Sequence, residues 1–295
     1  MKTLKPASET LARLAGDSAP NPTCGQSEPR DEHITAFRGL AEVLALVTVL
    51  ILAPTANCFA QAKLESPVRD IDPKESSRLG RELVDRLISQ VPARNVTNSG
   101  LLKLEGASGM LRSVPVHFTV VAEGSSWIAV YETKPTDEVS KRARVVIKHV
   151  AGQPNSYELV EGSPLDGAPR KLSGADTMIP FAGSDFWIAD LGLEFLHWPE
   201  QKLLRKQIRK GQSCDVLEST NPSPKPGAYR RVVSWLDIDT GGIVHADAYD
   251  GNDRLLKQFD PKEITKVRGE WQLEEMEIRN RQAGSKTRIE FKLGQ

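Results

Sequence analysis

Hydrophobic positions divide the chain into an apolar run near the N-terminus, one amphipathic stretch and a long series of short alternating segments. The amphipathic stretch starts at Asp72–Glu75, where an N-cap aspartate, a proline at the first helical position and a glutamate three residues after the cap predict a helix start. Leu79, Leu83 and Leu87 then recur every four residues, and Pro92 ends the pattern. We predict a helix whose apolar side needs a surface to lie on.

Most of the remaining chain alternates apolar and polar residues in short segments separated by Gly, Pro, Asn and Asp, which predicts strands. The predicted strands are 99–112, 114–122, 127–131, 144–150, 156–160, 203–209, 213–218, 229–237, 243–249, 254–259, 263–267, 270–279 and 287–293. Connections this short favour sequential antiparallel strands over helical crossovers. The expected fold is one α+β domain, in which a curved antiparallel sheet of about eleven strands covers two or more helices.

The apolar phase changes within segment 270–279. Trp271 and Leu273 lie on one side of the predicted strand, and after the Glu274–Glu275 pair Met276 and Ile278 continue the apolar set. A slip of this kind predicts a β-bulge.

A second helix is predicted between Ile179 and Pro199. Ser184 can cap it, and Asp185 lies in its first turn, where a carboxylate is favourable. At helical spacing the apolar face consists of Trp187, Leu191, Phe195 and Trp198. The opposite face, which we expect to be solvated, consists of Asp190, Glu194 and His197.

The N-terminal apolar run has the order of a secretory signal. Arg38 precedes an uncharged core over 43–53, and Ala60 and Ala62 bracket Gln61 as in a cleavage site. The core is shorter than the roughly 20 residues of a membrane span. We therefore predict an N-terminal extension and signal peptide over 1–62, cleaved after Ala62, a linker over 63–71 and a single domain over 72–295. The alternative is an uncleaved anchor that holds the domain at the inner membrane, facing the periplasm.

Charge and cysteine content exclude several classes of protein. The 39 Lys+Arg and 39 Asp+Glu residues give a formal net charge of zero, without the basic excess that a nucleic-acid binder uses to neutralise phosphates. Cys24, Cys58 and Cys214 lie far apart, with no CxxC pair, which argues against a disulfide scaffold or a structural zinc site. We expect Cys214, the one cysteine after the predicted cleavage site, to be a buried small hydrophobic residue.

Motifs for catalysis are missing from the sequence: it contains no HExxH, GxSxG, P-loop or GxGxxG. We therefore expect no enzyme activity, no cofactor and no metal site. A hydrolase that uses Asp185, Asp190 or His197 is the enzymatic alternative.

A sheet of this size needs much apolar material on its inner face, and the sequence offers two long helices to supply it. Either loops complete the core, or the concave face keeps an apolar cavity. A cavity lined by Trp, Phe and Leu would suit a lipid or acyl chain.

Several segments, in order, resemble the outer-membrane lipoprotein-sorting family of LolA-like proteins. They are Phe181–Leu191 with its Gly-Ser-Asp-Phe core, Tyr229–Asp237, Ala248–Lys257, Gly269–Met276 and Gly284–Thr287. The resemblance is clearest over 175–293 and weaker over 72–174, as in a divergent branch of the family.

This resemblance implies a LolA/LolB-like periplasmic half-barrel whose helices plug an apolar mouth and whose cavity binds acyl chains. The expected lining consists of Phe186, Trp187, Leu191, Phe195, Trp198 and Trp235. The expected partner is the acyl chain of a lipoprotein or lipid, an inner- or outer-membrane envelope protein is a further candidate, and we expect a monomer. The alternative function is an envelope structural or interaction module with a filled core and no lipid cargo.

Overall fold

The computed structural model describes residues 71–92, 94–134, 142–267 and 270–293. By its internal contacts the chain divides into Met1–Phe37 and Arg38–Gln295, and every described residue belongs to the second unit. The predicted apolar core 43–53, the cleavage site after Ala62 and the linker up to residue 70 lie outside the described residues. Among the helices of the described ranges, none has the length and apolar character needed to cross a membrane.

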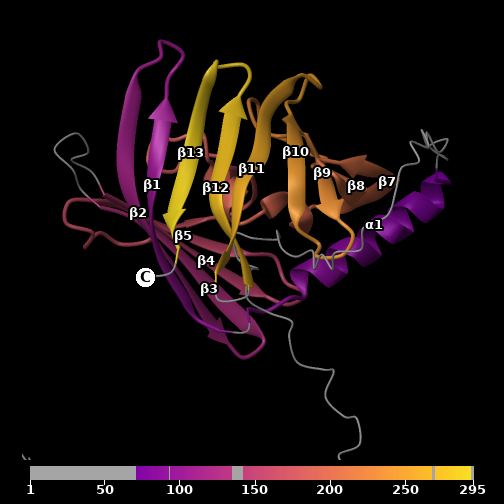
Figure 1. Ribbon diagram of the computed structural model, residues 1–295, viewed down its shortest axis with the longest axis horizontal. Helices are drawn as coiled ribbons and strands as arrows, with labels where there is room; N and C mark the ends of the chain where they lie inside the picture. The colour runs from indigo at the N-terminus through magenta and orange to yellow at the C-terminus, as the bar shows by residue number, and fades with distance from the viewer. Residues whose placement is uncertain (1–70, 93, 135–141, 268–269, 294–295) are drawn as a thin grey trace, which may run out of the picture. The chain divides into compact units, whose positions relative to one another are not determined.

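Thirteen antiparallel strands form one curved, unclosed sheet (Figure 1). They are β1 (Val96–Glu105), β2 (Leu111–Glu123), β3 (Ser126–Thr133), β4 (Arg142–Val150), β5 (Ser156–Gly162), β6 (Arg170–Leu172), β7 (Glu200–Arg209), β8 (Gln212–Thr220), β9 (Arg231–Asp237), β10 (Ile243–Tyr249), β11 (Leu255–Val267), β12 (Glu270–Asn280) and β13 (Ser285–Lys292). The expected α+β class with a curved antiparallel sheet is confirmed, with thirteen strands in place of about eleven.

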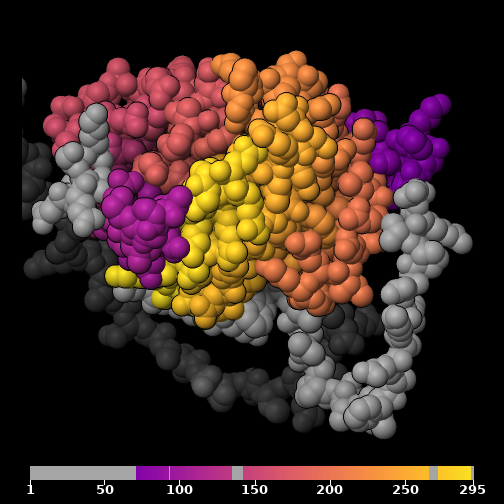
Figure 2. All heavy atoms as spheres, turned by 90° about the horizontal axis from the view of Figure 1, so that it is seen from above, coloured from indigo at the N-terminus to yellow at the C-terminus, as the bar shows by residue number. Residues whose placement is uncertain are grey.

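The strand order is β6-β5-β4-β3-β2-β1-β13-β12-β11-β10-β9-β8-β7, so two meanders join where β1 pairs with β13. Figure 1 shows this junction as the yellow β13 beside the purple β1, and Figure 2 shows the C-terminal strands between the N-terminal hairpin and the orange strands. The outer strands of the order, β6 and β7, are consecutive in the chain. The segment between them therefore has to pass from one edge of the sheet to the other. It contains η1 (Gly174–Thr177), α2 (Ile188–Leu191) and η2 (Glu194–His197).

The first helix, α1 (Pro73–Ile88), starts as the sequence predicts. The Asp72 carboxylate accepts hydrogen bonds from the backbone N–H groups of Lys74 and Glu75, at 3.0 and 3.4 Å. Its apolar side packs against β7, and the approach is close at Gly80, where a Cβ atom would lie 2.7 Å from the backbone of Gln201. The helix thus covers the inner side of one end of the sheet.

Two apolar clusters fill the inner side of the sheet. One lies under the β1–β5 meander and β12–β13, and it includes Val114, Tyr131 and Ile289. The other lies under α1, η2 and β7–β11. Phe259 of β11 packs against both clusters, at the point where they meet.

Several element boundaries differ from the prediction. Segment 99–112 contains a hairpin turn, because Gly109 takes a positive φ of 78° and Gly106 N–H donates to the Met110 carbonyl. Segments 254–259 and 263–267 are one strand, β11, and β6 has only three residues and no alternation to reveal it. The predicted bulge is confirmed, because the β11–β12 register shifts between Pro261 and Ile264.

The predicted second helix is wrong as a continuous element. It consists of the single turn α2 and the 3-10 turn η2, with Leu193 between them in the left-handed conformation at φ 49°. Gly192 precedes this break, and a side chain there would overlap the Tyr157 ring. The cap also differs, because Asp190 rather than Ser184 accepts the N-terminal hydrogen bond of α2.

Candidate functional site

The segment from Phe181 to Trp187 is fastened to the inner face of the sheet. The Asp185 carboxylate accepts hydrogen bonds from Ser285 Oγ and Thr287 Oγ1 of β13, at 2.6 and 2.9 Å. The Asp185 backbone N–H in turn donates to Thr287 Oγ1 at 2.9 Å. Both carboxylate oxygens are therefore occupied in holding the segment in place, which gives Asp185 a structural position rather than that of a free general acid or base.

A buried charged pair, Lys257 of β11 and Asp190 of α2, lies next to this segment. Lys257 Nζ of β11 donates to the Asp185 carbonyl oxygen at 2.7 Å and lies 3.4 Å from Asp190 Oδ2. The lysine side chain is 1% exposed and the aspartate side chain 12% exposed. Burial lowers the pKa of Lys257 to about 8, and the neighbouring Asp190 carboxylate opposes part of that shift.

Asp190 serves three groups at once. Its carboxylate accepts the Trp187 backbone N–H at 2.7 Å, which closes the first turn of α2, and it accepts the Tyr229 hydroxyl at 2.9 Å. Aromatic rings cover the pair, since the Trp187 ring stacks on Tyr229 and Lys257 Nζ lies 3.5 Å from the Trp187 ring centroid. Asp190 therefore does not lie on a solvated helix face, and that expectation is wrong.

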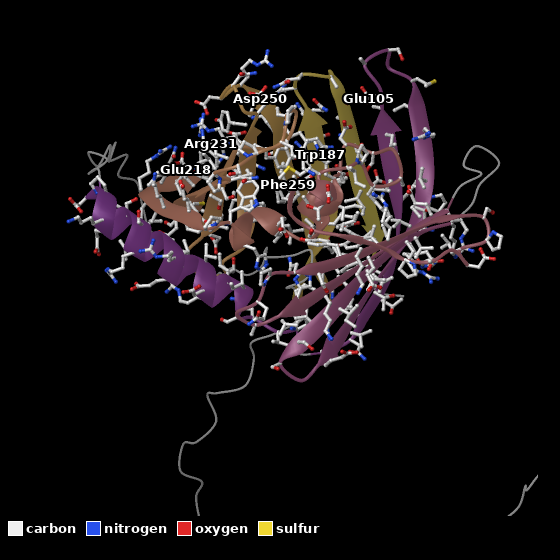
Figure 3. All side chains as sticks on the ribbon, turned by 180° about the vertical axis from the view of Figure 1, so that it is seen from behind. Glu105, Trp187, Glu218, Arg231, Asp250 and Phe259 are labelled. Carbon is white, nitrogen blue, oxygen red and sulfur yellow. The ribbon has the colours of Figure 1, made fainter. Side chains whose placement is uncertain are left out.

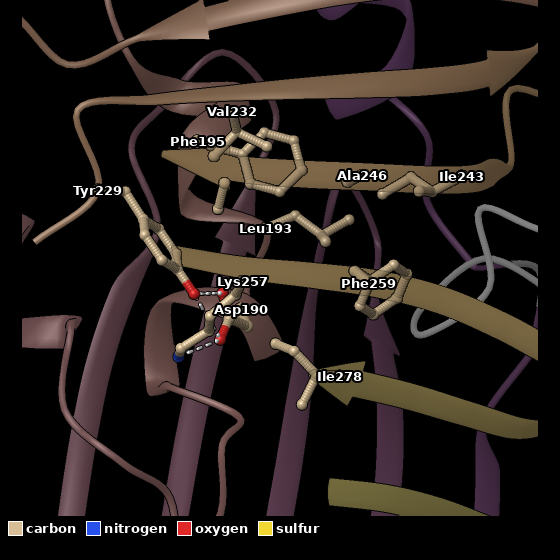
Figure 4. A pocket seen from close by; sticks show the side chains of 11 residues that line it. Asp190, Leu193, Phe195, Tyr229, Val232, Ile243, Ala246, Lys257, Phe259 and Ile278 are labelled. Atoms are coloured by element: carbon tan, nitrogen blue, oxygen red, sulfur yellow. Dashed lines mark hydrogen bonds and ion pairs between the residues drawn. The ribbon is translucent and has the colours of Figure 1, made fainter. Parts of the chain in front are cut away.

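An apolar pocket, here called the central pocket, opens beside this charged pair (Figure 4). Its volume is about 30 Å³. The apolar lining consists of Leu193, Phe195, Val232, Ile243, Ala246, Ala248, Phe259 and Ile278. Asp190, Tyr229 and Lys257 supply the polar lining, and Figure 4 shows them gathered at one side of the pocket. The arrangement is that of an apolar binding site with a few convergent polar groups.

A second cavity, here called the lateral pocket, is lined by residues of α1, β3, β4 and the crossing segment. Its volume is about 50 Å³. Leu87 and Ile88 of α1, Trp127 of β3, His149 of β4, Asn155, Leu191, Leu196 and His197 are among the residues that line it. Leu193 is the residue that the linings of the two pockets share.

The histidines of the lateral pocket are held neutral. Burial lowers the pKa of His149 to about 3, with the neighbouring His197 adding to the shift and Asn155 opposing it. Burial also lowers the pKa of His197. Next to the pocket, the Glu194 carboxylate accepts the Tyr157 hydroxyl at 2.7 Å, and burial raises the pKa of that carboxyl. The expectation that Glu194 is solvated is therefore wrong as well.

The structure separates the six residues expected to line the cavity. Phe195 lines the central pocket and Leu191 the lateral pocket. Phe186 and Trp198 are buried in the two apolar clusters, and Trp187 covers Lys257 beside the central pocket. Figure 3 labels Trp187 and Phe259 in the view from behind.

Trp235 does not join this group. It packs in a third cluster with Cys214, Val216 and Val233, whereas Val232 and Leu236 of the same strand point to the α1 side. Its ring lies under the Arg209 guanidinium at 4.2 Å, and its indole N–H donates to Gln207. Because successive residues of a strand face opposite sides, Trp235 lies on the outer face and cannot line the inner pockets. Cys214 is fully buried, as expected.

Sequence reasoning missed several residues of the central pocket, above all Lys257 and Tyr229. Tyr229, Lys257 and Phe259 stand in or next to the segments that carry the family resemblance, so the region was identified and the inward-facing side chains were not. The three candidate hydrolase residues do not share a pocket: Asp190 lines the central one, His197 the lateral one and Asp185 neither. Across the described ranges, no group of three or more His, Cys, Asp or Glu residues is placed to hold a metal ion.

Comparison with known proteins identifies solved structures with a similar fold. A family model described as "Uncharacterized protein" matches residues 163–293, nearly the stretch where the sequence resemblance is clearest. No curated protein matches the sequence. The structure is similar to a DUF1329 family protein from Desulfovibrio piger, with 20% identity and a TM-score of 0.60 over 74% of this chain and 92% of that one.

Two further solved structures show similarity to this chain. A putative outer membrane lipoprotein-sorting protein domain from Vibrio parahaemolyticus has 17% identity and a TM-score of 0.60, covering 74% of this chain and 94% of that one. A LolA superfamily protein from Nitrosomonas europaea has 13% identity and a TM-score of 0.49, covering 74% and 91%. The two structures with TM-scores of 0.60 confirm, at the level of the fold, the resemblance inferred from the sequence: the chain forms a half-barrel similar to theirs.

Proposed function

We propose that the protein is an exported, non-enzymatic carrier or sensor that binds the acyl chain of a lipid or lipoprotein on the inner face of its sheet. The central pocket is the observation that carries the proposal. Its walls are apolar side chains from β9–β12 and from the segment that crosses the sheet, and its one charged pair is already neutralised internally. Such a lining favours a hydrocarbon chain over a polar substrate.

Entry of a chain requires the crossing segment to move. A volume of about 30 Å³ is far below the roughly 150 Å³ of an engineered apolar cavity that binds benzene. Leu193 and Phe195 close the pocket from the crossing segment, and Leu193 holds a left-handed conformation that is unfavourable for a residue with a side chain. Displacement of η2 would relieve this strain and open the central pocket. The segment is thus suited to act as a plug.

The same small volume favours the alternative function, an envelope interaction module with a filled core. Such a module would bind its partner through its surface rather than through the central pocket. Met110 and Leu111, in the β1–β2 hairpin, are 74% and 70% exposed and offer an apolar tip for such a contact. The two functions differ in one observable, the uptake of an acyl chain.

Uptake of a fluorescent fatty acid by Ala246→Leu and Phe195→Asp variants tests the proposal. Ala246→Leu fills the central pocket without adding charge, and Phe195→Asp places a carboxylate in its wall. Each should weaken binding by at least about tenfold. Ile208→Asp, at a side chain that is 73% exposed, is the control and should bind as the unmodified protein does.

Circular dichroism shows whether each variant is folded. Folded Ala246→Leu and Phe195→Asp proteins that bind with unchanged affinity would contradict the lining. An unmodified protein that takes up no acyl probe would support the interaction module instead.

A further inference from the structure

β7 is an outer strand of the sheet, so only one of its edges pairs with another described strand (Figure 1). The helix α1 contacts the first half of β7. Gly80 packs against the backbone of Gln201, and Ser76 Oγ donates a hydrogen bond of 2.8 Å to the carbonyl of Leu203. The strand becomes exposed after these contacts, and the side chain of Ile208 is 73% exposed. α1 therefore leaves the second half of β7 open to solvent.

The backbone groups of this second half point alternately toward β8 and away from it. Arg209 and Gln212 flank the two-residue turn to β8, and the closing pair of such a hairpin is hydrogen-bonded. Bonded and non-bonded pairs alternate, which makes Ile208 and Ser213 a non-bonded pair. The Ser213 carbonyl accordingly accepts a hydrogen bond of 2.9 Å from the residue that follows β9. The N–H and C=O groups of Lys206 and Ile208 thus face away from β8, at the free edge.

The outer side of this edge is positively charged. The stretch 201–211 contains five Lys and Arg residues and no Asp or Glu. Arg205 donates to Gln207 Oε1, the atom that also accepts the indole N–H of Trp235 on the outer face. The guanidinium of Arg209 lies over the ring of Trp235. These contacts are with neutral groups, so they leave the positive charge of both arginines in place for an anionic partner.

The inner side of the same edge has a different character. Ile208 alternates with the two arginines along the strand and so points to the inner side. A groove of about 610 Å³, here called the edge groove, lies on this side between α1, β7 and β8. Leu79, Leu83 and Leu203 supply its apolar lining, and three of its five charged residues are carboxylates. An acidic side chain would be repelled on this side, whereas an apolar one would find Ile208 and the leucines.

We propose that the second half of β7 binds an extended acidic segment of a partner protein as an added β-strand. Its backbone would pair with the outward groups of Lys206 and Ile208. Because side chains alternate along a strand, acidic residues on one side would lie beside Arg205 and Arg209, and apolar residues on the other would lie beside Ile208. A second copy of this chain fits poorly, because β7 against β7 places like charges together. No residue of β7 lines the central pocket, so this binding is independent of acyl uptake.

A fluorescein-labelled peptide of about seven residues, with alternating glutamate and valine, tests the proposal by fluorescence anisotropy with the full chain. The unmodified protein should bind it, because the peptide combines an extended backbone with one acidic and one apolar side. Lysine in place of each glutamate should weaken binding by at least about tenfold. Methylation of alternate backbone nitrogens in the glutamate peptide should weaken it to a similar degree, because the hydrogen bonds to β7 are lost.

Ile208→Pro is the matching change in the protein. It removes one outward N–H group and no hydrogen bond to β8, and proline is tolerated on an edge strand in this orientation. The variant should fold, as shown by circular dichroism, and bind the glutamate peptide at least about tenfold more weakly. Ile208→Val keeps the N–H group and an apolar side chain and should bind like the unmodified protein. Both variants should take up a fluorescent fatty acid to the same extent as the unmodified protein.

Several outcomes would overturn the proposal without affecting the acyl carrier. They are no binding of the glutamate peptide, equal binding of the lysine peptide, and unchanged binding by a folded Ile208→Pro protein. A dimer in light scattering that Ile208→Pro abolishes would replace the partner segment by a second copy. If Ile208→Pro fails to fold, hydrogen exchange of the Lys206 and Ile208 amides in the unmodified protein gives the answer. The glutamate peptide should slow their exchange, and unchanged rates would reject the site.

Discussion

Removal of either member of the Asp190–Lys257 pair should destabilise the protein strongly. Removal of both should lower the free energy of unfolding by less than the sum of the two single losses. Lys257→Met leaves a carboxylate that is only 12% exposed, and Asp190→Asn leaves an ammonium group that is 1% exposed. In each single variant a buried charge has lost its partner. The double variant has neither charge, and its asparagine can still accept the Trp187 N–H that closes α2.

The burial of the pair sets the magnitude. Breaking a buried ion pair by removing one partner typically costs about 3–5 kcal/mol, because the other charge stays desolvated. The two single variants should each lose stability in this range. The double variant should lose at least about 2 kcal/mol less than the sum, which is the coupling expected of directly interacting buried residues.

Urea unfolding of the four proteins, followed by tryptophan fluorescence, measures the cycle. The exposed Asp176–Lys225 pair, with side chains 56% and 62% exposed at 2.7 Å, is the matched control and should show no measurable coupling. Losses at Asp190 and Lys257 that simply add would refute the reasoning, because they would show that the two groups do not neutralise each other in the folded state.

Three further predictions concern pH and packing. Lys257 has a folded-state pKa of about 8 against 10.5 as its ordinary value, so between these pH values the unfolded state binds more protons and stability rises with pH. Between pH 7 and 9.5 the free energy of unfolding, measured in urea, should rise by about 2 kcal/mol more for the unmodified protein than for Lys257→Met. The same pH dependence in both proteins would contradict the burial of Lys257. Gly80→Ala should lower the free energy of unfolding by about 1–3 kcal/mol, because the added Cβ would lie 2.7 Å from the Gln201 backbone. This steric overlap outweighs the better helix propensity of alanine. Gly251→Ala, with no atom within 4 Å of the added Cβ, should change stability little, and equal losses at the two sites would be inconsistent with the close approach of α1. Although burial lowers the pKa of His245, hydrogen bonds to carboxylates on β10 and β11 raise it above 6.5, so its contribution to stability is present below pH 6.5 and disappears as pH rises through the folded-state pKa. An NMR titration that places this pKa below 6.5 would contradict the assignment.

The sequence predicted those elements whose signals are local. The Asp72 cap and the leucine repeat fix α1, and alternation with Gly and Asp turns fixes most strands, because these patterns depend on neighbouring residues only. The bulge in β12 was visible for the same reason. The pairing of consecutive strands within each meander followed from the short connections, whereas the β1–β13 pairing and the placement of β6 and β7 at opposite edges did not.

What the sequence did not reveal depends on distant residues. The break at Leu193 follows from contact of Gly192 with Tyr157, 35 positions earlier, and helical spacing of the apolar residues hides it. Lys257 has its carboxylate partner on α2, so a lysine in an alternating strand gives no sign of being buried. Trp235 was expected in the cavity lining but lies on the outer face, because both faces of β9 are apolar and alternation alone does not say which face is concave.

Native mass spectrometry can detect a bound acyl ligand directly, with the protein expressed as the full chain, exported and purified from the periplasm without detergent. The measured mass should exceed that of the polypeptide by the mass of an acyl lipid or acylated peptide. Its loss in the pocket-filling Ala246→Leu variant would locate the ligand in the central pocket. A bare polypeptide mass, together with no uptake of a fluorescent fatty acid, would contradict the claim and favour an envelope interaction module.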